Sequence, residues 1–156
     1  KLIINESPVD PAYYDQMSKL LDALIEQRRQ KVLDYKAYLL EIAELSKQVL
    51  QPHGANPGTP ASITTAAQKA LYNNLWQDEG LALQMDGAIR GSSQDGWKAN
   101  TMKTKRVRKA IRTVLEPAWQ AKAANGLTGV QEPATGYELE AETTRILELA
   151  KNQHEY

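Results

Sequence analysis

Apolar residues recur at every third and fourth position through most of this 156-residue chain. This spacing is that of one face of an α-helix, and no stretch alternates convincingly between apolar and polar residues as a half-buried strand does. Residues 51–62 and 125–136 interrupt the pattern with Pro, Gly and Asn, which favour loops. The sequence therefore predicts an all-α fold, a compact bundle of about five to six helices with two Pro/Gly-rich loops.

Acidic residues that can cap a helix N-terminus mark the first two helices. Asp10 precedes a proline at the first helical position, which predicts a helix from Pro11 to about Arg29. Asp34 can cap a second helix, and the short link between the two predicts an antiparallel hairpin. We expect the apolar stripe of each helix to face the core. The stripes are Tyr13, Tyr14, Met17, Leu20, Leu21, Leu24 and Ile25 in the first helix, and Tyr35, Tyr38, Leu39, Ile42, Leu45 and Val49 in the second.

Four further helices follow from the same signals. Gly80 and Gly87 each weaken the fourth by about 1 kcal/mol relative to alanine. Pro117 leaves two possibilities for the fifth, which either ends there or bends and continues. The expected ranges are about Ile63 to Trp76, a fourth helix after the cap Asp78, a fifth from about Thr101 to Glu116 or Ala124, and Tyr137 to about Gln153, with Leu139, Thr143, Ile146, Leu147 and Ala150 of the last facing inward.

Length and composition set the broad class of the protein. A chain of this length suits one domain that buries roughly two-thirds of its unfolded surface, so we expect residues 1–156 to form a single helical domain. The chain begins with Lys1 rather than Met, which suggests a fragment of a longer polypeptide. No apolar run is long enough for a membrane span, and the absence of Cys fits a reducing compartment. A cytoplasmic protein without a membrane partner is therefore expected.

The densest charge lies between Lys98 and Arg112, where no Asp or Glu occurs. The net charge of the chain is zero, so any attraction for a polyanion must come from this local excess. A merely solvated helix face is the alternative, but such a face usually mixes charges and gains from Glu–Lys pairs four residues apart. We predict a basic face that has no acidic partner within the chain and contacts DNA phosphates without reading base sequence. The candidate DNA-binding residues are Lys98, Lys103, Lys105, Arg106, Arg108, Lys109 and Arg112.

Trp97 and the glycines around it raise two further questions. Trp97 can stack on a base or sugar, or it can cover the core at the start of the basic helix, and we favour the second interpretation. Gly91 and Gly96 have the separation found in a phosphate-binding loop. However, Trp97 stands where the lysine of that loop belongs and no strand precedes it, so we reject an ATP site here.

Catalytic and metal-binding constellations are not found in the sequence. There is no Cys nucleophile and no His-Glu-x-x-His motif. His53 and His154 each lack a second ligand at a suitable spacing. We therefore predict no catalytic residue, no metal site and no cofactor in this segment.

Three stretches of the chain form a recognisable pattern. The central one contains Asp95, Gly96, Trp97, Lys98, Asn100, Lys103 and Val107 to Ile111. The other two are Glu6 to Tyr14 with Met17 to Leu21, and Ile146 to Tyr156. Together they resemble the C-terminal helical region of the motor (R) subunit of type I restriction enzymes. None of the three is a catalytic motif.

The resemblance implies a role within a restriction system. In that family the whole subunit is an ATP-dependent DNA translocase and endonuclease, a hydrolase that uses ATP and magnesium. It works with the methyltransferase (M) and specificity (S) subunits of the same complex. The resemblance therefore implies a domain that docks the motor subunit on the methyltransferase core and adds nonspecific contacts to double-stranded DNA.

Two other functions compete with this one. The basic face can meet an acidic surface of a partner subunit, in which case the domain serves assembly without touching DNA. Without the resemblance, a small helical transcription regulator is a third reading. A recognition helix needs base-reading polar side chains at its start, and Thr101 and Met102 are poor candidates.

Overall fold

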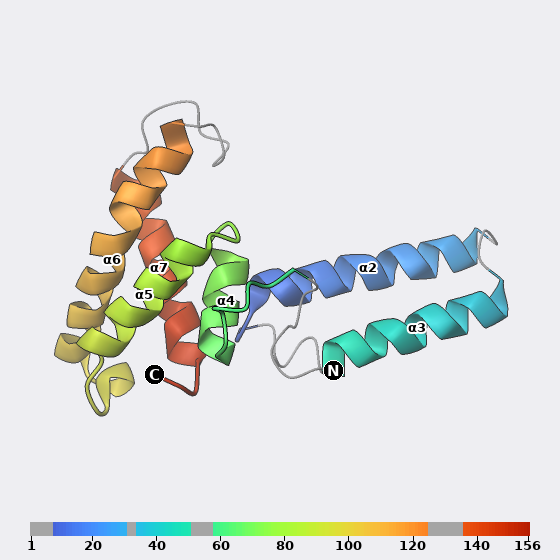
Figure 1. Ribbon diagram of the computed structural model, residues 1–156, viewed down its shortest axis with the longest axis horizontal. Helices are drawn as coiled ribbons and strands as arrows, with labels where there is room; N and C mark the ends of the chain where they lie inside the picture. The colour runs from blue at the N-terminus through green and yellow to red at the C-terminus, as the bar shows by residue number, and fades with distance from the viewer. Residues whose placement is uncertain (1–7, 31–33, 51–57, 125–135) are drawn as a thin grey trace.

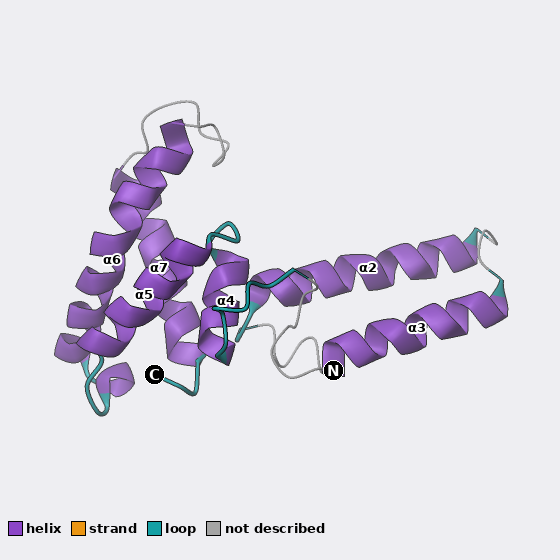
Figure 2. Ribbon diagram, viewed as in Figure 1, coloured by secondary structure: helices purple, strands orange, loops and turns teal. Residues whose placement is uncertain are grey.

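The chain is helical through most of the residues that the computed structural model describes, which are 8–30, 34–50, 58–124 and 136–156 (Figure 1). Within these residues there are six α-helices, one 3₁₀ helix and no strand, which confirms the all-α prediction (Figure 2). The predicted loops at 51–62 and 125–136 fall mostly outside the described residues, as does His53. The helices are α2 (Pro11–Arg29), α3 (Tyr35–Leu50), α4 (Ala66–Asn74), α5 (Glu79–Ser92), η1 (Trp97–Ala99), α6 (Thr101–Ala124) and α7 (Gly136–Asn152).

Side-chain caps begin the helices where the sequence predicts them. The carboxylate of Asp10 accepts from the N–H of Tyr13 at 3.3 Å, and Asp78 accepts from Leu81 at 3.0 Å. Such bonds satisfy backbone donors that have no partner inside the helix. Asp34 and Asn100 cap α3 and α6 in the same way.

The start of α4 differs from the prediction, and the structure shows which of the two predicted ends of α6 is formed. The third helix begins at Ala66 rather than near Ile63, because Thr65 and Gln68 form a capping box that fixes the first turn there. The helix that contains Pro117 continues to Ala124, so the second of the two possibilities holds. None of the described helices is long and apolar enough to cross a membrane.

The main hydrophobic core lies among α4, α5, α6 and α7. α6 packs against both α5 and α7, and α4 packs against α5 (Figure 1). The five residues of the last helix that the sequence predicts to face inward are all buried. Completely buried side chains include Leu71, Leu75, Met85, Ile89, Val107, Ile111, Leu115, Thr143 and Ile146.

The α2–α3 hairpin extends from one side of this bundle and contacts it through α4 (Figure 1). It has a separate and smaller core of Tyr13, Tyr14, Met17 and Leu45. The prediction that both apolar stripes are buried is wrong for much of their length, because no third helix among the described residues covers them. Exposed members of the stripes include Leu20, Ile25, Tyr35 and Leu39.

Candidate nucleic-acid interface

The corner between η1 and α6 positions the start of the basic face. Gly96 precedes η1 with a φ of 70°, a left-handed conformation that glycine adopts without strain. The hydroxyl of Thr104 in α6 donates to the carbonyl of Trp97 at 2.7 Å, which holds the two elements together. Lys98 is thereby fixed beside the first turns of α6.

Trp97 anchors this corner in the core. Its side chain is 3% exposed and packs in the main cluster, and its ring N–H donates to the carbonyl of Tyr156 at 3.4 Å. The interpretation of Trp97 as a cover of the core is therefore confirmed. Stacking on a base or sugar, the other possibility, has no exposed ring face to use.

A pocket of about 410 Å³ lies where η1, α6 and α7 meet. Four of its eight lining residues are cations, and they come from three different elements. The hydroxyl of Thr101 is a further hydrogen-bond donor among them, whereas the hydroxyl of Thr104 already donates to Trp97. The lining comprises Lys98, Ala99, Thr101, Thr104, Lys105, Arg108, Leu147 and Lys151.

Lys151 was missed by the sequence analysis, because it lies on α7, far along the chain from the basic run. Its spacing could have indicated this position, because Lys151 follows Leu147 by four residues and both side chains therefore lie on one face of the helix. Lys151 forms an ion pair with Glu148 at 2.8 Å. It adds a fourth cation to the pocket formed by the predicted residues.

The prediction that the basic face has no acidic partner is wrong at Arg108 and Arg112. Both guanidinium groups bind the carboxylate of Glu140 on α7, Arg108 at 2.6 Å. The sequence pattern could not show this pair, because Glu140 becomes a neighbour only when α6 and α7 pack together. The hydrogen bond from Arg108 lowers the pKa of Glu140 and keeps the carboxylate charged.

Two lysines of the basic face are held by backbone carbonyls. The ammonium group of Lys98 donates to Gln153 at 2.5 Å, and that of Lys103 donates to Asp95 at 2.6 Å. Burial lowers the pKa of Lys98. These bonds neutralise no charge, so both lysines still contribute to the positive potential of the face.

Lys105, Arg106 and Lys109 are exposed and form no ion pair with any described residue. Lys105 and Lys109 project from one side of α6, with Arg108 and Arg112 beside them, and Arg106 lies about 100° further around the helix. The structure therefore brings the predicted cations together on α6 and η1. Five of the seven, all except Arg108 and Arg112, form no ion pair in the described part of the chain.

The chemistry that this surface offers is anion binding. Ammonium, guanidinium and hydroxyl groups all donate hydrogen bonds, and Arg binds phosphate oxygens in a bidentate manner. In the ranges that the structure describes, no group of three or more His, Cys, Asp or Glu side chains could hold a metal ion.

Comparisons with known proteins give no match: no protein-family model fits the sequence, no curated protein is similar to it, and no solved structure resembles the fold.

Proposed function

We propose that this chain is the C-terminal helical domain of the motor subunit of a type I restriction enzyme. In this role it contacts the backbone of double-stranded DNA and docks the motor on the methyltransferase and specificity subunits. ATP and magnesium would serve the nuclease and translocase of the parent subunit, with no catalytic residue in this segment. The docking role and the family rest on the sequence resemblance.

The observation that carries the DNA contact is the convergence of cations on α6, η1 and α7. Four cations surround one pocket, and Arg106 and Lys109 extend the positive surface along α6 without acidic partners in the described residues. Long cationic side chains on one helix suit phosphate contacts, which require no particular base sequence. A translocating enzyme needs such contacts, because it must bind equally along its whole track.

Arg108 and Arg112 can join the contact by exchanging Glu140 for a phosphate. Exposed ion pairs typically contribute less than about 1 kcal/mol, so this exchange costs little. With three to five phosphate contacts, log K should fall with log salt at a slope between about 2.7 and 4.5. Dissociation constants of about 10⁻⁴ to 10⁻⁶ M are expected at physiological salt.

The test is a salt titration of DNA binding with matched charge reversals. The triple variant Lys105→Glu, Arg106→Glu, Lys109→Glu should lose binding at least about tenfold and lower the slope by about 2.7. The control, Lys19→Glu, Arg29→Glu, Lys36→Glu, makes the same change of net charge on the hairpin. It should bind like the wild-type protein. Binding that ignores salt, or equal losses in both variants, would refute the DNA contact.

A second candidate function is assembly alone, in which the basic face of α6 meets an acidic partner surface. The pairing of Arg108 and Arg112 with Glu140 favours it, because this face already binds a carboxylate. The two functions separate in one experiment on the triple variant of α6. Loss of methyltransferase pull-down with an unchanged DNA gel shift would support assembly alone.

A further inference from the structure

The outer half of the α2–α3 hairpin is a helix pair with an unfinished core. In residues 20–29 and 35–44, no side chain is buried. Leu20, Ile25 and Leu39 are each more than 40% exposed. Helices of this length are marginal in water unless an apolar face is packed. The exposed side chains therefore indicate a surface that another element covers.

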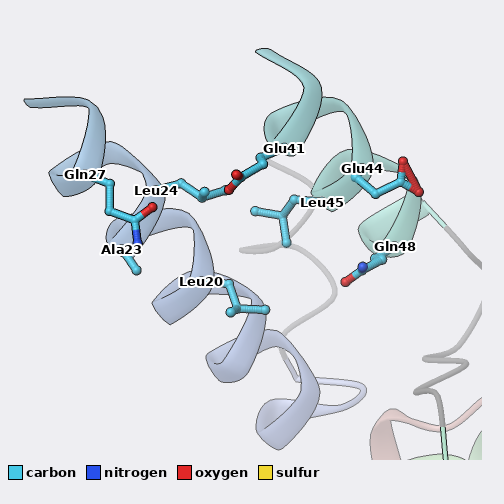
Figure 3. A pocket seen from close by; sticks show the side chains of 8 residues that line it. All are labelled: Leu20, Ala23, Leu24, Gln27, Glu41, Glu44, Leu45 and Gln48. Atoms are coloured by element: carbon cyan, nitrogen blue, oxygen red, sulfur yellow. The ribbon is translucent and has the colours of Figure 1, made fainter. Parts of the chain in front are cut away.

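A groove of about 320 Å³ runs between the two helices (Figure 3). Leu20, Ala23 and Leu24 of α2 form one wall, and Leu45 of α3 lies opposite them (Figure 3). On α3 the lining residues extend from Glu41 to Gln48, which is about 10 Å of helix. An apolar groove between two antiparallel helices suits a third helix, which would complete a three-helix bundle.

The polar rim of the groove indicates the charge of that helix. Glu41 and Glu44 of α3 lie along it, with Gln27 and Gln48 as the other polar lining residues (Figure 3). No Lys or Arg lines the groove. Glu44 pairs with Lys47 at 3.1 Å, but both side chains are more than 60% exposed, so this pair is easily exchanged.

A second copy of this chain does not fit the groove. Two hairpins packed groove to groove would bring the acidic rims together, which is unfavourable. The basic helix α6 of another copy also lacks an apolar stripe to offer, because Val107, Ile111 and Leu115 are completely buried in the bundle.

We propose that the α2–α3 groove binds an amphipathic helix of a partner protein, one with an apolar stripe flanked by Lys or Arg residues. The stripe packs against Leu20, Leu24 and Leu45, and the basic residues meet Glu41 and Glu44. Helix-in-groove recognition of this kind relies on apolar anchors spaced three and four residues apart. This site is separate from the basic face of α6 and does not depend on DNA binding.

The test uses two synthetic peptides with the same leucine stripe and opposite flanking charges. Each has about 18 residues, enough to form several helical turns and to span the groove. Binding is followed by fluorescence anisotropy of the labelled peptide. The lysine-flanked peptide should bind the chain at least about tenfold more tightly than the glutamate-flanked one. Amide hydrogen exchange in residues 20–29 and 35–44 should slow when it binds.

Matched variants separate this groove from general attraction. Leu20→Ser should weaken binding of the lysine-flanked peptide at least about fivefold. Leu40→Ser should not, because Leu40 is 64% exposed and lies outside the lining of the groove. Glu41→Lys with Glu44→Lys should reverse the preference between the peptides. Asp15→Lys with Asp22→Lys, the same charge change on α2 away from the groove, should preserve it.

Three results would overturn the proposal. The first is binding of neither peptide, and the second is equal affinity for both. The third is a dimer in sedimentation experiments that Leu20→Ser abolishes, since that result assigns the groove to a second copy of the chain. Circular dichroism of each variant establishes that the helices are retained.

Discussion

Asp10 is a capping residue that has become buried between the hairpin and the bundle. Its carboxylate accepts hydrogen bonds from the side chains of Asn73 and Asn74 in α4, at 2.7 and 2.8 Å, in addition to the N–H of Tyr13. No Lys or Arg forms an ion pair with it in the described residues. Arg145 of α7 donates to Asn74 at 3.1 Å and thereby connects α7 to the same cluster. Asp10 thus joins α2 and α4 through neutral donors, and Arg145 extends the cluster to α7.

Burial raises the pKa of Asp10 to about 6, although its three hydrogen bonds act to lower it. The ordinary value is 3.8, so between these two pH values the folded protein binds more protons than the unfolded chain. The stability contributed by protonated Asp10 is therefore present below pH 4 and is lost as the pH rises through 6. The loss amounts to at most about 3 kcal/mol.

The substitution Asp10→Asn should remove this pH dependence, because asparagine also caps a helix but does not titrate. We expect the free energy of unfolding of the wild-type protein, relative to that of the variant, to fall between pH 4.5 and 7. Urea unfolding at both pH values measures the difference. A difference that stays constant with pH would show that Asp10 titrates normally.

At the scale of helices, the capping residues are the features of the sequence that best predict where a helix begins. Asp10, Asp34 and Asp78 could be recognised because a cap bonds only to residues two or three positions later. Helix existence and start are local properties of this kind. The burial of a stripe is not local, and the sequence could not show that the hairpin lies outside the bundle.

The candidate interface likewise has some features that are local to one helix and others that depend on how helices pack. The cations of α6 share a face because of helix geometry, which their spacing alone predicts. Two other features depend on how α6 packs against α7. Glu140 pairs with Arg108 and Arg112, and Lys151 lines the same pocket as Lys98. Side chains that become neighbours only through packing share no local pattern, so a single sequence does not predict their contact.

Glu140 is the point at which α7 restrains the basic face of α6. Glu140→Gln removes the carboxylate that competes with phosphate for Arg108 and Arg112, so DNA should bind about two- to fivefold more tightly at low salt. The salt slope should rise by up to about 1.8, because two more cations reach phosphates. The same salt titration measures both quantities. Glu26→Gln, which removes one charge from the hairpin, should change neither, and equal effects of the two substitutions would contradict the competition.

At the scale of the whole molecule, residues 153–156 connect elements that are far apart along the chain. Gln153 donates to the carbonyl of Val9 at 2.6 Å, next to the start of α2. Glu155 accepts from the N–H of Ala67 in α4 at 3.2 Å and pairs with Arg90 of α5 at 3.0 Å. Although burial acts to raise it, these bonds hold the pKa of Glu155 below its ordinary value. The segment also accepts the Lys98 bond, so it supports the candidate interface.

Tyr156 is the contact through which this segment reaches the buried carboxylate of Asp86. Its hydroxyl donates to Asp86 at 2.5 Å, next to bonds from Arg90 and Gln68 at 2.9 Å each. Burial raises the pKa of Tyr156, so the hydroxyl keeps its proton and remains a donor.

Tyr156→Phe should lower the free energy of unfolding by about 1 to 3 kcal/mol, because it leaves a buried carboxylate with one donor fewer. The ring is kept, so the packing of Arg90 over it at 5.2 Å is preserved and the loss belongs to the hydroxyl. Tyr137→Phe is the matched control, since Tyr137 is 83% exposed and its hydroxyl can bond to water. Urea unfolding compares the two variants with the wild-type protein.

Since residues 153–156 also contact the start of α4, amide exchange near Ala67 should quicken in Tyr156→Phe and not in Tyr137→Phe. Equal midpoints and equal exchange would mean that the last residues rest on the bundle without stabilising it.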